Sequence, residues 1–192
     1  MTFNFENSKK LALGKKDKSS IRGVDAPIRN LVSFVNAHDD YFTTSSCSGR
    51  IVLIKDEDKK QKGLFLFRTH EKISFEKLKE ALEKIAGEDK KIMVMFKQEP
   101  CLLVVSCRDK DSQWKLFSFA RNNGWKKSGI LSVDKKFLIE LMATETISFP
   151  IIDGGKILVS DDFLKLVLEK ANKNLKKGWE KIKRLEWLME KP

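Results

Sequence analysis

One short segment gathers most of the side chains that could bind an anion. From Thr43 to Arg50 the chain reads TTSSCSGR, which supplies five hydroxyl groups and one guanidinium. Hydroxyls, backbone N–H groups of small residues and a guanidinium are the donors that bind a carboxylate or a phosphate. The segment therefore indicates an anion site, although an ordinary edge strand of small residues would have the same composition.

The spacing of the serines, histidines and cysteines gives less support to a hydrolytic site or a metal site than to an anion site. Serines in this segment could act as nucleophiles, but His38 and His70 are the chain's two histidines and no G-x-S-x-G motif is present. The cysteines Cys47, Cys101 and Cys107 have no C-x-x-C spacing and are odd in number. We therefore expect reduced thiols and no structural metal.

The glycine motifs of the common nucleotide-binding folds are absent from the sequence. Neither G-x-G-x-x-G nor G-x-x-x-x-G-K-[ST] occurs, which argues against a Rossmann domain and a P-loop. The paired glycines Gly154 and Gly155 lie in PIIDGGK, a pattern typical of a hairpin turn. Any cofactor must therefore bind to a less familiar scaffold.

The elements that would position these residues alternate between strands and helices. We expect helices over about 25–36, 75–85 and 111–123, and strand-like runs over 41–55, 63–70, 91–96, 101–108, 128–133, 135–143, 146–152 and 156–160. Tight polar turns favour antiparallel pairing. We predict an α+β fold of two layers, with a largely antiparallel sheet and helices on one face, and the similar rhythm of the two halves is compatible with an internal duplication. Residues 1–23 would form an extended or partly ordered arm, and 24–192 a single catalytic domain.

A long helix is predicted for the C-terminal part of the chain, over about 160–190. Apolar and small residues recur there in steps of three and four, from Leu164 through Leu175 and Ile182 to Met189, behind a possible N-cap at Ser160. The remaining faces carry many lysines. They could form a solvated helix surface or a stripe that contacts phosphates.

The charge of the whole chain restricts its partners. Lys and Arg (38) outnumber Asp and Glu (27), which gives a net charge of +11 over 192 residues. Such an excess favours a polyanionic partner. No apolar run reaches the roughly 20 residues that span a bilayer, and the N-terminal residues lack the apolar core of a signal peptide, so we expect a cytoplasmic protein.

Five motifs in order identify a resemblance to a known family. The segment DDYFTTSSCSGRI from Asp39 to Ile51 closely resembles the signature of the third group of wybutosine-synthesising enzymes, which are tRNA methyltransferases. RTHEK, FKQEP, SCR and GWKKSGI follow in the family's order, and DKSSIRGVD fits its N-terminal element. The resemblance covers nearly the whole chain. One departure is the stretch Met142 to Thr144, where relatives tend to have Arg-Ser-Thr and this chain has no basic residue.

The resemblance implies a specific reaction. Members of the family use S-adenosylmethionine to methylate the N4 ring nitrogen of a tricyclic wybutosine precursor beside the anticodon of tRNA(Phe), which carries an aminocarboxypropyl side chain in archaea. It also implies an α/β two-layer fold outside the usual Rossmann methyltransferases. This agrees with the missing glycine motif.

Roles for individual residues follow from that reaction. Methyl transfer requires a base near the attacking nitrogen, and we predict Asp39 first and His70 second, although a histidine at a strand end often has a purely structural contact. Arg50 and Arg108 could each bind a carboxylate of cofactor or substrate, and Glu99 could bind the matching ammonium. The predicted cofactor contacts are Ser45, Ser46, Ser48, Gly49, Arg50, Glu99, Pro100, Ser128 and Gly129. Arg108, Trp125, Lys126 and Lys127 are the predicted substrate or tRNA contacts, with Trp125 alternatively a core residue.

Two other classes of function stay open at this point. A non-catalytic RNA-binding module would explain the charge equally well and would not bind S-adenosylmethionine. A helix-mediated interaction protein would explain the apolar seam and would assemble through residues 160–190.

Overall fold

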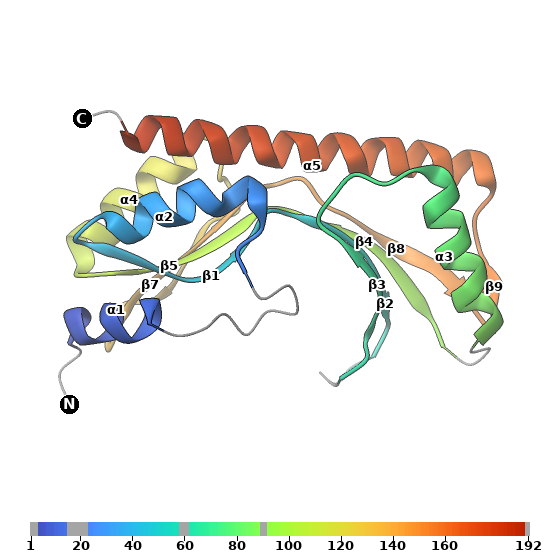
Figure 1. The fold of residues 1–192 in the computed structure, drawn as a ribbon, viewed down its shortest axis with the longest axis horizontal. Coiled ribbons are helices and arrows are strands. Elements are labelled where there is room, and N and C mark those ends of the chain that lie inside the picture. The colour runs from blue at the N-terminus through green and yellow to red at the C-terminus, as the bar shows by residue number, and fades with distance from the viewer. Residues whose placement is uncertain (1–3, 15–22, 58–61, 89–91, 191–192) are drawn as a thin grey trace. The chain divides into compact units, whose positions relative to one another are not determined.

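The structure is a computed structural model, and it describes residues 4–14, 23–57, 62–88 and 92–190. Its helices and strands alternate along the chain (Figure 1). The helices are α1 (Phe5–Leu13), α2 (Arg29–Ala37, preceded by the 3-10 turn Ala26–Ile28), α3 (Phe75–Glu88), α4 (Lys110–Asn122) and α5 (Asp161–Glu190). The strands are β1 (Tyr41–Cys47), β2 (Arg50–Lys55), β3 (Phe65–Thr69), β4 (Val94–Glu99), β5 (Leu102–Cys107), β6 (Gly129–Ser132), β7 (Phe137–Met142), β8 (Ile147–Asp153) and β9 (Lys156–Ile157).

The chain divides into two compact units, each assembled from separate segments. Unit one contains 1–48, 101–144 and 178–192, and unit two contains 49–100 and 145–177. The chain therefore passes from one unit to the other four times, and the last passage lies within α5. Each unit has its own antiparallel sheet.

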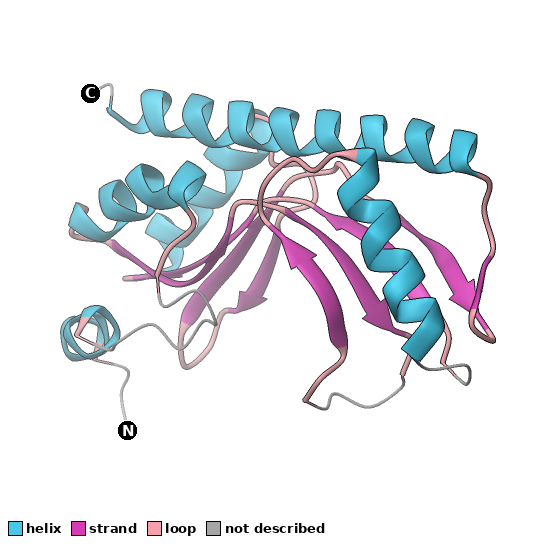
Figure 2. Ribbon diagram, turned by 45° about the vertical axis from the view of Figure 1, so that its right-hand side comes forward, coloured by secondary structure: helices cyan, strands magenta, loops and turns pink. Residues whose placement is uncertain are grey.

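Unit one has a four-stranded sheet in the order β1-β5-β7-β6. Successive residues of a strand point to opposite faces, and β1 shows this at Tyr41 and Phe42. Tyr41 belongs to the main core with residues of α2 and α4, and its hydroxyl donates to the Ser112 carbonyl. Phe42 contacts Phe5 of α1, with ring centroids 5.3 Å apart. Helix α1 therefore covers the face of this sheet opposite to α2 and α4 (Figures 1 and 2).

The core of unit one is apolar and includes two of the cysteines. Cys101 and Cys107 are buried there, and none of the three cysteines forms a disulfide. Burial, with the nearby carboxylates of Asp109 and Asp40, raises the pKa of Cys107 to about 12. Its thiol is therefore protonated at physiological pH and has a packing role.

Unit two has a five-stranded sheet in the order β3-β2-β4-β8-β9, covered by α3 and by residues 161–177 of α5. Val94, Phe96 and Gln98 are buried along β4 in the alternation that a strand requires. The Gln98 side chain accepts a hydrogen bond of 2.7 Å from Asn174 of α5, and it donates to the carbonyls of Glu99 and Glu145. This buried amide pair satisfies polar groups that would otherwise be costly, and fixes α5 against β4.

The predicted cap of the C-terminal helix and the predicted glycine turn are both present in the structure. Ser160 accepts from the Phe163 N–H and caps α5, and the predicted seam is buried at Leu164, Leu175 and Ile182. Gly154 and Gly155 have φ of 58° and 75° and connect the antiparallel strands β8 and β9, so the predicted hairpin turn is confirmed.

The predicted α+β class, antiparallel pairing and long C-terminal helix are confirmed, with two differences. The strands form two sheets, because the run 41–55 breaks at Ser48 and Gly49 into β1 of one sheet and β2 of the other. The predicted arm, of which residues 4–14 and 23 are described, contains helix α1 with Phe5 buried. The internal duplication and the single catalytic domain stay predictions. No helix among the described residues is long and apolar enough to cross a membrane.

Candidate active site

The segment 43–50, for which an anion site was predicted, begins on β1, which is an edge strand of the sheet of unit one. Ser45 is exposed and Ser46 is half-buried, opposite Val104 and Leu103 of β5. A register shift between Thr43 and Ser45 interrupts the ladder. Both interpretations of the segment therefore keep support, since it is an edge strand and it also exposes hydroxyl groups.

Ser48 binds an anion that belongs to the chain itself. Its backbone N–H and its hydroxyl both donate to one carboxylate oxygen of Asp25, at 2.8 and 3.1 Å, and the residue is fully buried. The predicted contact of Ser48 with the cofactor is thus replaced by a contact with Asp25. Sequence reasoning had noted Asp25 as part of the N-terminal motif, but not its pairing with Ser48. Ser48 fixes the backbone just before Gly49, which is buried with φ 95°.

Arg50 and Glu99 form an ion pair within unit two. They are direct partners in the register of β2 and β4, and the Arg50 Nε–H donates to a Glu99 carboxylate oxygen. The guanidinium also lies over the Phe65 ring, 5.0 Å from its centroid. The side chains are 26% and 33% exposed, so a ligand can reach this pair of opposite charges. Two residues predicted from separate motifs thus lie together.

Two further predicted residues of unit two lie at strand ends. His70 follows β3 and is half-buried, and Pro100 follows β4 and is also half-buried. Pro100 has no backbone N–H, which suits the position where a strand stops pairing.

Arg108 organises the turn that carries Asp39. Its guanidinium donates to the Asp40 carboxylate at 2.8 Å and to the Asp39 carbonyl at 2.9 Å, and pairs with Glu6 of α1 at 2.7 Å. These hydrogen bonds, first that to Glu6 and then that to Asp40, raise the pKa of Arg108. The guanidinium thus pairs with carboxylates of the chain, and its contact with a substrate carboxylate stays a prediction. The Asp39 side chain lies exposed at the turn between α2 and β1. Sequence reasoning missed Asp40 and Glu6; the doublet Asp39-Asp40 was the available signal.

In the segment after α4, the predicted contact of Trp125 with the tRNA is wrong. This residue is 0% exposed and belongs to the core of unit one, so it cannot stack on a base of tRNA, and its core interpretation is the right one. Ser128 is also structural, because its hydroxyl donates to the Trp125 carbonyl at 2.6 Å and accepts from the Met142 N–H. Lys126 and Lys127 are exposed. Gly129 begins β6 opposite Glu140 and is half-buried.

The stretch Met142 to Thr144 lacks the basic residue that relatives tend to have, but a lysine of α5 lies beside it. Ala143 is buried, and its N–H donates to the Cys101 carbonyl. The ammonium group of Lys181 on α5 lies 3.4 Å from the Thr144 hydroxyl. A cation is therefore present at this place, supplied by another element.

Comparison with known proteins decides the family. The model of the family described as "Methyltransferase TYW3" matches residues 6–191. The chain belongs to the TYW3 methyltransferase family. It is therefore a methyltransferase, as the motifs predicted.

Relatives of the TYW3 family match along most of their length. A "tRNA wybutosine-synthesizing protein 3 homolog" of Danio rerio is 34% identical over 94% of this chain and 72% of its own. The "tRNA(Phe) 7-((3-amino-3-carboxypropyl)-4-demethylwyosine(37)-N(4))-methyltransferase" of Archaeoglobus fulgidus is 33% identical over 92% of this chain and 88% of its own. The solved structure of the PH1069 protein from Pyrococcus horikoshii OT3 has a TM-score of 0.83 at 31% identity, covering 97% of this chain and 93% of that protein.

Proposed function

We propose that this chain transfers a methyl group from S-adenosylmethionine to the N4 ring nitrogen of 7-aminocarboxypropyl-demethylwyosine, at the position 3′ of the anticodon in tRNA(Phe). The match of the TYW3 family model over residues 6–191 carries the proposal. The printed name of the Archaeoglobus relative supports the substrate and the reacting nitrogen. The net charge of +11 supports a nucleic acid as the partner.

The cofactor fits the pair of Arg50 and Glu99. Its amino-acid end carries a carboxylate and an ammonium group, which require one cation and one anion side by side. Arg50 and Glu99 supply these two charges from adjacent strands, and both are only partly buried. Binding would exchange their mutual ion pair for two with the ligand. Bound there, the cofactor supplies an electrophilic methyl group on a sulfonium.

Most of the other predicted contact residues are accessible to a ligand, which supports the same proposal. Ser45, Ser46, Pro100 and Gly129 are exposed or half-buried and keep their proposed role in cofactor binding. Lys126 and Lys127 are exposed and would bind phosphates of the tRNA. Ser48 acts indirectly, by fixing the backbone before Gly49 and Arg50.

The attacking nitrogen must lose its proton, and Asp39 is the proposed base. Its carboxylate is exposed, and Arg108 binds its backbone carbonyl. A base acts on a proton within hydrogen-bond reach, about 2.6–3.2 Å between heavy atoms. His70 is the second proposed base. We also propose that the protein acts in the cytoplasm and uses no metal, so that the chemistry depends on positioning and on this proton transfer.

The experiment combines cofactor binding with product analysis. Calorimetric titration with S-adenosylmethionine should show binding, and mass spectrometry of nucleosides from precursor-bearing tRNA should show one added methyl group. Absence of cofactor binding by the wild-type protein would leave a non-catalytic RNA-binding module as the better description.

Arg50→Ala is the sharpest variant, with Arg68→Ala as its matched control. We expect Arg50→Ala to abolish methylation and weaken cofactor binding, because it removes the cation that would bind the ligand carboxylate. Arg68 lies over the same Phe65 ring, at 5.5 Å, but is not proposed to bind the cofactor, so Arg68→Ala should keep activity. Full activity of Arg50→Ala, or inactivity explained by a loss of thermal stability as large as that of a core substitution, would contradict this role.

A further inference from the structure

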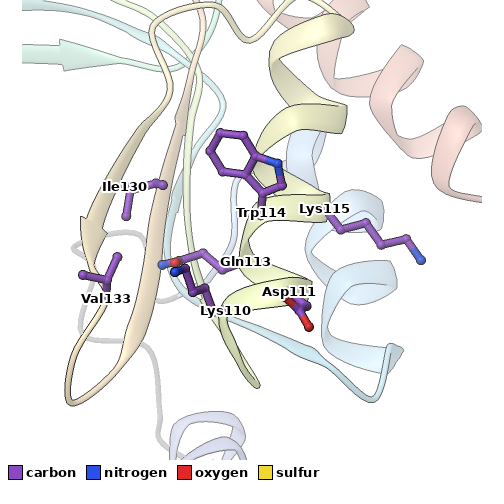
Figure 3. A pocket seen from close by; sticks show the side chains of 7 residues that line it. All are labelled: Lys110, Asp111, Gln113, Trp114, Lys115, Ile130 and Val133. Carbon is purple, nitrogen blue, oxygen red and sulfur yellow. The ribbon is translucent and has the colours of Figure 1, made fainter.

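An open apolar pocket lies between α4 and β6 in unit one, and the proposed chemistry does not use it. Its volume is about 550 Å³, and it is lined by Lys110, Asp111, Gln113, Trp114, Lys115, Ile130 and Val133. Figure 3 shows the Trp114 ring on the helix side of the pocket, with Ile130 and Val133 on the strand side. Trp114 is 60% exposed, although an indole is among the most costly side chains to leave in water. Together with the exposed Ile130 and Val133 across the pocket, this indole forms an apolar patch that a ligand could cover.

The walls of the pocket are held at a fixed separation. Gln113 is buried, and its amide donates to the Ser132 carbonyl at 2.8 Å and to the Leu138 carbonyl at 3.1 Å. One side chain of α4 thus binds to β6 and to β7. Trp114 also packs on Phe117, with ring centroids 5.6 Å apart. The indole is therefore presented on a rigid support, which reduces the entropy lost when a ligand binds.

The charge around the pocket selects an anionic ligand. Lys110 and Lys115 belong to its lining, and Lys135 and Lys136 follow Val133 in the turn between β6 and β7. All four lysines are exposed, against the two carboxylates of Asp111 and Asp134. An aromatic face bordered by lysines is the combination that binds an unpaired base together with its phosphates.

We propose that this pocket binds an unpaired nucleobase of the tRNA, which stacks on Trp114 while the surrounding lysines bind the adjacent phosphates. The proposal rests on the proposed function, because it takes tRNA as the substrate, and it adds a place for that substrate on the chain. A protein partner pairing with the edge strand β6 would also cover the apolar side chains. The excess of lysines favours the RNA.

Trp114→Ala tests the proposal, with Trp187→Ala as a matched control. Trp187 is 54% exposed on α5, but its pocket also contains the carboxylates of Glu186 and Glu190, which disfavour a polyanion. Binding of an unmodified tRNA(Phe) transcript is measured at fixed salt. We expect Trp114→Ala to weaken it by about 5- to 150-fold, the range for losing one stacked base. Trp114→Phe should restore most of the affinity, and Trp187→Ala should match the wild type.

If Trp114 contributes only to tRNA binding, a kinetic prediction follows. At saturating precursor-bearing tRNA, single-turnover methylation by Trp114→Ala should equal that of the wild type, and cofactor binding should be unchanged. Wild-type RNA affinity in Trp114→Ala, an equal loss in Trp187→Ala, or a change in oligomeric mass with unchanged RNA affinity would overturn the proposal. If the proposed function were wrong instead, the wild type would fail to methylate while the Trp114 effect on RNA binding persisted.

Discussion

Two arginines that looked equivalent in sequence have different surroundings. Arg50 is paired across the register of two strands with Glu99, and this pair is partly exposed. Arg108 binds Asp40, Glu6 and the Asp39 carbonyl through its Nε and Nη2 groups, so these donors are engaged within the chain. We therefore propose that Arg50 binds the ligand and that Arg108 positions the turn at Asp39.

The carboxylate of Asp39 gives a prediction at this scale. Asp39→Asn keeps the size of the side chain and removes its basicity, so turnover should fall by about 10² to 10⁴ with cofactor affinity little changed. Single-turnover methylation of precursor-bearing tRNA, followed by mass spectrometry, measures it. Asp153→Asn removes an exposed carboxylate from the end of strand β8 in unit two and should have no effect.

The contrary outcome for Asp39 is equally specific. If the residue only supports its turn, the substitution would cost about 1 kcal/mol of stability and leave the single-turnover rate unchanged. The proton transfer would then belong to His70, or to no side chain.

At the scale of elements, helix α4 begins with a capping box, and its first turns carry Gln113 and Trp114, which line the pocket. Asp109 accepts hydrogen bonds from the Ser112 N–H and hydroxyl, both at 2.8 Å, and the Ser112 hydroxyl accepts from the Asp109 N–H. This capping box satisfies donors that a helix start leaves unpaired. It fixes the first turn just before Gln113 and Trp114.

Removal of this cap gives a stability prediction. Asp109→Ala should lower the free energy of unfolding by about 1 kcal/mol, measured by denaturant titration. Asp111→Ala leaves the capping box in place and removes only a first-turn charge, so its loss should be nearer 0.3 kcal/mol. Equal effects of the two variants would show that charge alone matters.

The same cap has a pH dependence with a definite sign. The hydrogen bonds from the Ser112 backbone and then its hydroxyl lower the pKa of Asp109 in the folded chain. Its contribution to stability is therefore complete above the unfolded pKa, near 4, and is lost as the pH falls further through the folded value. Asp109→Ala should remove this part of the acid-induced decline.

For the whole molecule, the excess of positive charge predicts a steep salt dependence. The net charge is +11, and the exposed positions of α5 include Lys170, Lys173 and Lys177. Each phosphate contact releases counterions, so log affinity for tRNA should fall with log salt by about 0.7 to 0.9 per contact. Replacing Lys126 and Lys127 together by alanine should reduce that slope by about 1.4 to 1.8. Lys84→Ala, beside Glu88 on α3, should not change it. A slope that stays flat would exclude RNA as the main partner.

The sequence by itself determined the α+β class, the antiparallel pairing, the long C-terminal helix and the hairpin at Gly154 and Gly155. These features depend on local periodicity, capping and turn chemistry, which neighbouring residues encode. It also determined the family, because the motifs occur in order along the chain. The helix α1 was missed because its apolar face is short, and only Phe5 of it is buried.

Only the tertiary structure decided which partners the polar side chains have. The contacts of Ser48 with Asp25, of Arg50 with Glu99 and of Arg108 with Asp40 join residues 23 to 68 positions apart. Trp125 and Trp114 are each followed by a lysine in the sequence, yet one is fully buried and the other is 60% exposed. Sequence spacing does not fix such contacts, because they depend on how strands and helices far apart in the chain pack, and packing decides which donors remain for a ligand.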